Sequence, residues 1–366
     1  MLSVCLVRRR KMKGLILAAG KGTRLRPLSH TKPKPLLPVA NQPVISYGIE
    51  HLYNMGIRDI GLVIQPNQKE LFTKNLLLDD RKDIRMHYIY QREQKGIAHA
   101  VIQAEDFIGT DSFVLLLGDN LIEESLDTLR EHFNIGNIHA TVMVTEVSQP
   151  EDYGIAEIEN NEIINVEEKP VNPKSNLAII GAYIFNQNIF RAIHSISPSA
   201  RGEYEITDAI KWLIDHGYNI NYVKTNKPTF DVGTMERWLE ANQWMLKQSA
   251  HQWNGDFGNG SAQGSIIIPP VKIGDNCKIE DAVIGPFVSI ESDTTIKKCR
   301  INNSIVLKGS CFKNIPFEIT NSIFGEKTKL IGKDLNNDTI QGFLGENSSI
   351  FLSKSTGLSN KRKYEK

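Results

Sequence analysis

The chain is poor in cysteine and has no long apolar run. Its 366 residues include four cysteines, and no two of them form a Cys-x-x-Cys pair. A disulfide framework is therefore not expected in a chain of this length, and reduced thiols in a cytoplasmic protein are expected instead. Because no apolar stretch is long enough to cross a bilayer, the sequence predicts no membrane partner.

The chain also lacks an excess of charge of either sign. Its 43 Lys and Arg residues nearly balance its 42 Asp and Glu residues, and the formal net charge is +1. Proteins whose main partner is nucleic acid or an anionic membrane usually carry a clear positive excess, so neither partner is expected. Any binding of phosphate must therefore come from a local arrangement of residues.

The two ends of the chain differ in composition from its middle. In the first eleven residues the apolar side chains come before the basic run, which is the reverse of a secretory signal. We expect residues 1–11 to form a disordered N-terminal extension and residues 355–366 to form a disordered tail. The length between them is too great for one typical core, so two domains are expected.

Between residues 12 and 250, short apolar runs alternate with helix-length segments. Strands are expected at 14–18, 60–64, 86–90 and 113–117, and helices at 44–55, 69–78, 98–107, 208–216 and 236–248. This alternation predicts an α/β domain with a Rossmann-like, mostly parallel sheet and helices on both faces. A second group, richer in strand, follows from residue 140 and is expected to close over a site at the carboxyl ends of the first strands.

After residue 250 the pattern changes to isoleucines that recur every five or six positions. These are Ile273, Ile279, Ile284, Ile290, Ile296 and Ile301. Such a step is typical of a left-handed parallel β-helix, in which each inward aliphatic side chain stacks on its copy one coil away. We expect a hexapeptide-repeat β-helix domain over residues 251–354, in which a Gly- and Asn-rich linker or turn cluster at 254–261 comes before the repeats.

One stretch, residues 13–38, carries a strand, a glycine loop and two cations. Gly20 and Gly22 follow the strand, Arg24 comes next, and Lys34 lies between two prolines. Glycines let backbone N–H groups approach oxygens closely, and Arg supplies a forked set of donors. The loop does not match the dinucleotide fingerprint, because Leu25 stands where a third glycine would be needed, and it does not match the P-loop, which would need Gly-Lys followed by Ser or Thr. The stretch therefore predicts a polyphosphate site of another type.

This stretch resembles the signature of sugar-1-phosphate nucleotidyltransferases, and further motifs follow in that family's order. They are Gln91 with residues 96–100, residues 118–120, residues 153–154, residues 167–170, residues 201–208 and residues 231–234. The asparagine after Asp119 and the run at 201–208 are most similar to glucose-1-phosphate thymidylyltransferases, and the repeat resembles the tail of their long form. The resemblance implies a catalytic nucleotidyltransferase domain over residues 12–250, with Mg²⁺ as cofactor. Its expected reaction is transfer of a deoxythymidylyl group from dTTP to glucose 1-phosphate, giving dTDP-glucose and pyrophosphate for deoxysugar biosynthesis.

The resemblance also implies a role for each residue of the site. Arg24 and Lys34 are the expected catalytic residues, because they would neutralise the triphosphate and the leaving pyrophosphate. The nucleotide is expected at Leu17, Ala19, Gly20, Gly22, Thr23, Arg24, Gln91, Gly96 and Asp119. The sugar phosphate is expected at Tyr153, Gly154, Glu168, Lys169 and Arg201. Mg²⁺ is expected at Asp119 and Asp231, because it prefers one or two carboxylates together with phosphate oxygens and water.

Several neighbouring polar positions have structural interpretations as well. We expect Thr207 to cap the helix that follows it, and His99 to be a helix residue and not a catalyst. Glu203 and Glu205 share one face of an extended segment and could either order the loop or touch the substrate.

The sequence leaves the substrate open, because two positions near the expected sugar pocket depart from the family pattern. Asp152 stands where short-form enzymes usually have arginine, and residues 229–230 lack a tryptophan common before the second metal aspartate. The alternatives are a UTP-dependent uridylyltransferase and an amino-sugar-1-phosphate nucleotidyltransferase. A less favoured one is a non-catalytic protein that binds sugar nucleotides.

The repeat itself is not expected to be catalytic. Hexapeptide β-helices occur in acyltransferases that use a histidine base, but all nine histidines of this chain lie between His30 and His251, outside the repeat. A structural and oligomerising role is therefore favoured. The resemblance implies a homo-oligomer, and β-helix tails of this kind suggest a trimer.

Overall fold

The computed structural model describes residues 12–30, 32–76, 81–249 and 260–332. All of these residues fall within one compact unit. The predicted extension at 1–11, the predicted tail at 355–366, most of the predicted linker and the end of the predicted repeat domain lie outside the described residues. The predicted boundary at residue 250 stays a prediction.

A nine-stranded mixed sheet forms the first part of the fold, in the order β10-β9-β11-β6-β1-β4-β5, with β8 paired to β11 and β12 paired to β8. The four strands from β6 to β5 are parallel, and β11 joins them antiparallel. The strands are β1 (Met12–Leu17), β4 (Asp59–Ile64), β5 (Arg85–Tyr90), β6 (Ser112–Leu117), β8 (Ala140–Glu146), β9 (Gly154–Glu159), β10 (Glu162–Glu168), β11 (Leu177–Phe185) and β12 (Ile220–Lys224). The predicted Rossmann-like sheet is confirmed.

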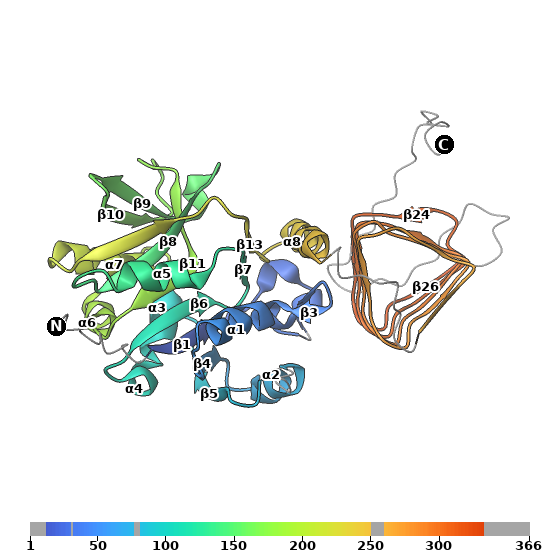
Figure 1. Cartoon of the computed structure of the whole chain (residues 1–366), viewed down its shortest axis with the longest axis horizontal. Helices are drawn as coiled ribbons and strands as arrows, with labels where there is room; N and C mark the ends of the chain where they lie inside the picture. Colours follow the sequence, from blue (N-terminus) through green and yellow to red (C-terminus); the bar gives the residue numbers. More distant parts are fainter. Residues whose placement is uncertain (1–11, 31, 77–80, 250–259, 333–366) are drawn as a thin grey trace, which may run out of the picture. The chain divides into compact units, whose positions relative to one another are not determined.

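Helices cover both faces of this sheet (Figure 1). They are α1 (Val44–Asn54), α2 (Lys69–Asn75), α3 (Ile97–Ile102), α4 (Glu105–Ile108), α5 (Leu126–Phe133), α6 (Asn188–Ser195), α7 (Ile206–Asp215) and α8 (Met235–Gln248). The helix predicted over 98–107 is in fact two helices, because the Ala104 N–H donates to the Val101 carbonyl three residues back and the chain turns there. Helices α5 and α6 were not predicted.

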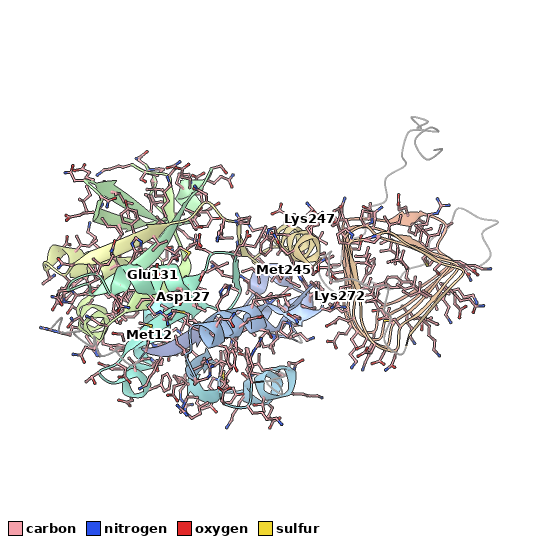
Figure 2. All side chains as sticks on the ribbon, in the orientation of Figure 1. Met12, Asp127, Glu131, Met245, Lys247 and Lys272 are labelled. Carbon is pink, nitrogen blue, oxygen red and sulfur yellow. The ribbon has the colours of Figure 1, made fainter. Side chains whose placement is uncertain are left out.

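Helix α5 shows how side-chain pattern fixes which face is buried. Its apolar residues Leu126, Leu129 and Phe133 are buried against the sheet. Asp127 and Glu131, labelled in Figure 2, lie one turn apart between these apolar positions and belong to the polar side of the helix. The Ser125 hydroxyl caps the helix by accepting a hydrogen bond from the Asp127 N–H at 3.3 Å.

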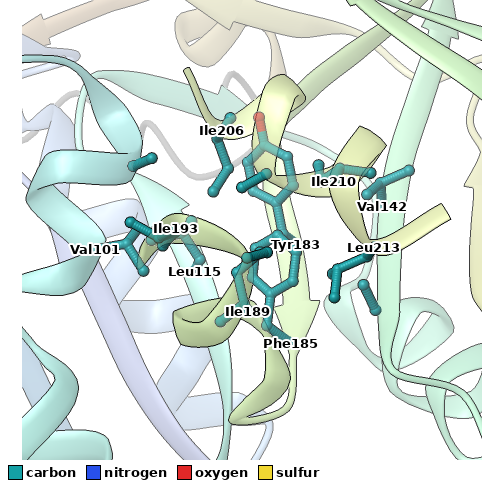
Figure 3. Packing of buried hydrophobic residues seen from close by; sticks show 14 of the residues in the cluster. Val101, Leu115, Val142, Tyr183, Phe185, Ile189, Ile193, Ile206, Ile210 and Leu213 are labelled. Atoms are coloured by element: carbon teal, nitrogen blue, oxygen red, sulfur yellow. The ribbon is translucent and has the colours of Figure 1, made fainter. Parts of the chain in front are cut away.

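Alternate residues of the parallel strands face two separate cores. Leu15 belongs to the core under α3, α6 and α7, and Ile16 belongs to the core under α1, α2 and α5. Figure 3 shows the first core, where side chains of α6 and α7 surround Tyr183 and Phe185 of β11. The sheet is therefore held on both sides, and the loops at the carboxyl ends of its strands are left to form a site.

Short segments complete this part and carry site residues. They are the 3₁₀ turns η1 (Thr23–Leu25), η2 (Leu28–His30), η3 (Lys34–Leu36) and η4 (Pro150–Asp152), the hairpin β2 (Pro38–Val39) and β3 (Gln42–Pro43), and the antiparallel pair β7 (Asn120–Ile122) and β13 (Thr229–Asp231). No helix within the described ranges is long and apolar enough to span a membrane.

Residues 261–331 form three parallel sheets, in the orders β14-β17-β20-β23-β26, β15-β18-β21-β24 and β16-β19-β22-β25. These are the faces of the predicted left-handed parallel β-helix, whose coils have a triangular outline in Figure 1. Ile279 pairs in register with Ile296, and all six isoleucines of the predicted repeat are buried. The strands are β14 (Ser261–Gln263), β15 (Ile266–Ile267), β16 (Val271–Ile273), β17 (Lys278–Glu280), β18 (Val283–Ile284), β19 (Val288–Ile290), β20 (Thr295–Lys297), β21 (Arg300–Ile301), β22 (Ser304–Val306), β23 (Cys311–Lys313), β24 (Glu318–Ile319), β25 (Ser322–Phe324) and β26 (Lys329–Ile331).

Candidate active site

The glycine loop folds back on the segment that carries Lys34. Gly22 has a φ of 59°, in the left-handed region that favours glycine, and a Cβ there would lie 3.3 Å from Cβ of Lys34. The Ser29 hydroxyl donates to the Gly22 carbonyl at 2.7 Å and closes the loop. The loop and Lys34, predicted together from the sequence, are therefore adjacent in space.

Lys34 lies between the two aspartates predicted to bind metal. Its ammonium donates a hydrogen bond to Asp119 and a second, of 2.7 Å, to Oδ1 of Asp231. Asp119 follows β6, and Asp231 ends β13 directly opposite Asn120 of β7. The Val232 N–H also donates to the Asp119 carbonyl at 3.1 Å. Pairing of β7 with β13 thus brings together two carboxylates that are far apart in the sequence.

Lys34 is 9 % exposed, and its charge is maintained by these neighbours. Burial by itself lowers the pKa of a lysine, but the carboxylates of Asp119 and Asp231 outweigh burial and raise the pKa of Lys34 above its ordinary value. The site therefore holds the Lys34 ammonium between two carboxyl groups.

Arg24 reaches the same group of charges from the glycine loop. A Cβ on Gly233 would lie 3.1 Å from the Arg24 guanidinium and 2.8 Å from Oδ2 of Asp231. Because Gly233 has no side chain, there is room beside it for both the Arg24 guanidinium and the Asp231 carboxylate. Arg24 itself is exposed, which leaves its donors open to a ligand.

A cavity of about 370 Å³ opens beside Lys34. Of the predicted site residues it is lined by Leu17, Ala19, Gly20, Lys34, Gln91, Gly96 and Asp119. Its lining also includes Lys21 and Gln94, which were not predicted as site residues, Ile97 and Ala100 of the predicted motif at 96–100, and Glu203, for which contact with the substrate was one of two expected roles. Gly22, Thr23 and Arg24 do not line the cavity.

Gln91 is held in one orientation at the cavity wall. Its side chain is almost fully buried, and its amide nitrogen lies 3.2 Å from the Gly96 carbonyl and 3.1 Å from Nδ1 of His99. Burial lowers the pKa of His99, so the neutral ring can accept from Gln91. Gly96 has a φ of 101°, and a Cβ there would clash with the Tyr204 carbonyl at 2.5 Å. His99 belongs to α3, as predicted.

The predicted sugar-side residues meet at one end of the β9–β10 hairpin. Gly154 lies opposite Glu168, and the Lys169 N–H donates to the Tyr153 carbonyl at 2.9 Å. Arg201 joins this end of the hairpin through Oε1 of Glu168, 3.8 Å from its guanidinium. The structure therefore brings together all five predicted sugar-phosphate residues.

Arg201 is paired with more than one carboxylate. Besides Glu168 it contacts Glu203 at 2.9 Å and Glu205 at 3.2 Å. Glu205 is 3 % exposed, and burial raises the pKa of both Glu205 and Glu168. Glu203 also lines the cavity, so this segment both pairs with Arg201 and borders the cavity, and its contact with a substrate stays a prediction.

The predicted capping role of Thr207 is wrong. Helix α7 begins at Ile206, its N-cap is Glu205, and no side chain caps it. Thr207 is already in the first turn and is buried, and its hydroxyl donates to Oε2 of Glu168 at 3.1 Å. The partly buried carboxylate of Glu168 needs hydrogen-bond donors, and Thr207 supplies one.

The oxygen donors suit a magnesium ion that a substrate would help to hold. Within the described residues, no group of three or more His, Cys, Asp or Glu side chains is placed to bind a metal by itself. Asp119 and Asp231 nevertheless converge on one point, occupied by the Lys34 ammonium. Two carboxylates completed by phosphate oxygens and water match the preference of Mg²⁺.

Arg237 was not predicted from the sequence. It lies in the first turn of α8, and its guanidinium donates to the Tyr153 hydroxyl at 2.8 Å. A signal was available, because a cation in the first turn of a helix is disfavoured by the helix dipole and calls for an explanation.

Comparison with known proteins shows which family the sequence matches. The sequence model of the family described as Nucleotidyl transferase matches residues 13–248. A glucose-1-phosphate thymidylyltransferase of Streptomyces antibioticus is 36% identical over 335 residues, which are 87% of this chain and 93% of that protein. A UTP–glucose-1-phosphate uridylyltransferase of Haloferax volcanii is 37% identical over 241 residues, 65% of this chain and 98% of that protein.

A solved structure shares the same fold. It is a Bacillus anthracis protein assigned as a glucose-1-phosphate thymidylyltransferase, in complex with sucrose. Its TM-score with this chain is 0.60 at 35% sequence identity, and the match covers 64% of this chain and 94% of that protein.

Proposed function

The chain belongs to the nucleotidyl transferase family, and we propose that it transfers a deoxythymidylyl group from dTTP to glucose 1-phosphate. The products are dTDP-glucose and pyrophosphate, for use in deoxysugar biosynthesis. The observation that carries this proposal is Lys34, which lies between Asp119 and Asp231 at the wall of a cavity lined by Gln91 and Gly96. This arrangement supports the proposal, because a triphosphate needs a cation, a metal ion needs carboxylates, and a base needs an amide with which it can form hydrogen bonds.

In the proposed reaction, a phosphate oxygen of glucose 1-phosphate attacks the α-phosphorus of dTTP. A P–O bond forms to the sugar phosphate, and the bond from the α-phosphorus to the oxygen that bridges to the β-phosphate breaks, so the electron pair leaves with pyrophosphate. The attacking oxygen is already ionised and needs no general base. The protein must therefore align two anions and neutralise charge, and Lys34 and Arg24 are the residues that would do so.

We propose that Asp119 and Asp231 hold Mg²⁺ together with phosphate oxygens. When bound, the ion supplies positive charge at the phosphates. With the ion bound, Lys34 would share these carboxylates with it. The Lys34 ammonium would then be free to contact a phosphate oxygen. The chain's own contribution is to bring two carboxylates and one ammonium to a single point.

The remaining residues would bind the base, the triphosphate and the sugar phosphate. Gln91 and the Gly96 backbone would read the pyrimidine, and the loop at Gly20, Gly22 and Thr23 would hold the triphosphate. Tyr153, Gly154, Glu168, Lys169 and Arg201, which meet at the β9–β10 hairpin, would hold glucose 1-phosphate. Glu168 would accept hydrogen bonds from sugar hydroxyls, while Lys169 and Arg201 would neutralise the phosphate.

We also propose a cytoplasmic homo-oligomer. The three cysteines in the described part of the chain are free thiols, which suits a reducing compartment. The β-helix is proposed to assemble the subunits, with a trimer as the expected form.

Pyrophosphate release tests the proposal. Purified protein is given glucose 1-phosphate with dTTP or UTP, in the presence of Mg²⁺ or of excess EDTA, and glucosamine 1-phosphate replaces glucose 1-phosphate in a parallel series. We expect release with dTTP that stops when the metal is chelated. Release with UTP at an equal rate would support uridylyl transfer, which the similarity to the Haloferax volcanii enzyme favours as the second candidate. No release with any pair would contradict the enzymatic proposal.

A further inference from the structure

Arg237 links the two halves of the site. It extends from α8, the helix that follows Asp231, and its guanidinium donates to the Tyr153 hydroxyl at 2.8 Å. Tyr153 directly precedes β9, in the half of the site that carries Glu168 and Lys169. One hydrogen bond therefore joins the segment of the metal carboxylate to the segment of the sugar-side residues.

The position of Arg237 is electrostatically unfavourable for the helix alone. It is the third residue of α8, where the helix dipole presents positive charge, and its backbone N–H is taken by the Thr234 hydroxyl at 3.3 Å. Burial also acts to lower the pKa of its guanidinium. Tyr153, Asp231 and Glu240 offset burial and raise that pKa, so partners outside the first turn account for a cation here.

Tyr153 in turn restrains the backbone of Lys169. The Tyr153 carbonyl accepts the Lys169 N–H at 2.9 Å. Lys169 has a φ of 46°, in the left-handed region that a residue other than glycine holds only when its surroundings support it. The direction in which the Lys169 ammonium leaves the backbone thus depends on the place of Tyr153, and Tyr153 is held at its other end by Arg237.

We propose that Arg237 is a positioning residue for the sugar side of the site. Through Tyr153 it fixes the backbone of Lys169, and with it the ammonium that would meet the sugar phosphate. This inference rests on the proposed function and deepens it by naming what sets the geometry between the metal carboxylate Asp231 and the sugar-side residues. The residue directly before Tyr153 is Asp152 and supplies no positive charge. The cation that contacts the Tyr153 hydroxyl is Arg237 of α8.

Calorimetric binding of a sugar nucleotide and of a free nucleotide tests the proposal without requiring turnover. The proteins are wild type, Arg237→Gln, Arg237→Lys, Tyr153→Phe and the double variant R237Q/Y153F. We expect R237Q to weaken binding of dTDP-glucose about tenfold, because one charge-assisted hydrogen bond is lost. The affinity for dTTP should stay within about twofold of the wild-type value. R237K should recover part of the loss. Because both groups act through one contact, the double variant should bind no more weakly than either single variant.

The matched control is Arg191→Gln. Arg191 is an exposed residue of α6, and it makes the same kind of contact, with its guanidinium 3.3 Å from the Tyr218 hydroxyl, away from the site. This variant should bind both ligands as wild type does. Additive losses in R237Q/Y153F, or an equal loss for dTTP and dTDP-glucose, would overturn the positioning role.

Steady-state kinetics separates failure of this inference from failure of the proposed function. If wild type turns over glucose 1-phosphate and R237Q has an unchanged KM for it, the positioning role alone is wrong. If R237Q raises that KM and leaves the KM for the triphosphate unchanged, both stand. If wild type binds neither dTDP-glucose nor UDP-glucose and releases no pyrophosphate, both the proposed function and this inference are contradicted.

Discussion

The ammonium of Lys34 donates a 2.7 Å hydrogen bond to Asp231, 197 positions further along the chain. The same ammonium binds Asp119, so one cation joins the loop after β1, the end of β6 and the end of β13. If the cation is removed, two carboxylates are left facing each other in a partly buried site. The consequences of that removal can be measured.

Lys34→Met should lower stability and make stability depend on Mg²⁺. We expect a loss of about 1–3 kcal/mol, below the usual cost of breaking a fully buried pair because both aspartates are partly exposed. The freed carboxylates should then bind Mg²⁺ more readily, so that millimolar MgCl₂ raises the Tm of the variant more than that of wild type. Thermal unfolding with MgCl₂ or with EDTA measures both effects.

Lys13→Met is the matched control for that experiment. Lys13 is also a part-buried lysine, which donates to the Phe107 carbonyl at 2.6 Å and pairs with Asp111 at 3.1 Å. Its loss should reduce stability without any added gain from Mg²⁺. An equal response to Mg²⁺ in both variants would show that Asp119 and Asp231 are not the metal ligands.

Gly233→Ala should reduce activity while the fold is kept. The new methyl would lie 2.8 Å from Oδ2 of Asp231 and 3.1 Å from the Arg24 guanidinium, so both side chains must move. We expect kcat/KM to fall about tenfold or more, because charge stabilisation depends on the exact placement of its donors. Gly48→Ala is the control: its Cβ would make an ordinary 3.5 Å contact with Leu116, and alanine suits the interior of α1. A Gly233→Ala enzyme as active as Gly48→Ala would remove Gly233 from the site.

Local patterns were enough to predict the parallel strands, the β-helix and the glycine loop. The spacing of isoleucines predicted inward positions because each coil repeats the same local geometry, and Ile279 does stack on Ile296. The loop with Lys34 could be predicted because its residues are close in sequence. The residue patterns that indicate each of these features are local in the sequence.

Contacts between distant segments could not be predicted in the same way. Thr207 has the residue type of an N-cap, but its hydroxyl is used by Glu168, 39 positions earlier, and that partner is set by how α7 packs on the β9–β10 hairpin. Arg237 is similar, because its partner Tyr153 is 84 positions away. For such residues the sequence shows at most a local anomaly, here a cation at the start of a helix.

Arg24→Ala should impair catalysis far more than stability. Arg24 is exposed, and its guanidinium lies near Gly233 and Asp231 without being buried in the core. We expect kcat to fall about a hundredfold, as when a single donor to developing charge is removed, with Tm within about 2 °C of wild type. Arg26→Ala, at another exposed position of the same loop, should keep most activity. A large fall in Tm for Arg24→Ala would mean that Arg24 is structural.

Glu168→Gln should stabilise the protein in a way that depends on pH. Burial, and next the charge of Glu205, raise the pKa of Glu168 above its ordinary value of 4.5. The folded state therefore holds a proton that the unfolded state has released, and wild type loses stability as pH rises from the ordinary value through the raised one. Glutamine carries no such charge and can still accept from Thr207.

The Tm advantage of Glu168→Gln should thus be absent near pH 4, grow as the pH rises through that window, and stay constant above it. Glu167→Gln, at the exposed neighbouring position on β10, is measured alongside as the control substitution. Pyrophosphate release by Glu168→Gln should fall, since a neutral amide replaces the carboxylate proposed to accept sugar hydroxyls. A more stable and less active variant would mean that the partly buried charge of Glu168 is kept at a cost to the fold because the substrate needs it. A variant with unchanged activity and a flat Tm difference across pH would show that Glu168 is neither strained by burial nor part of the sugar side of the site.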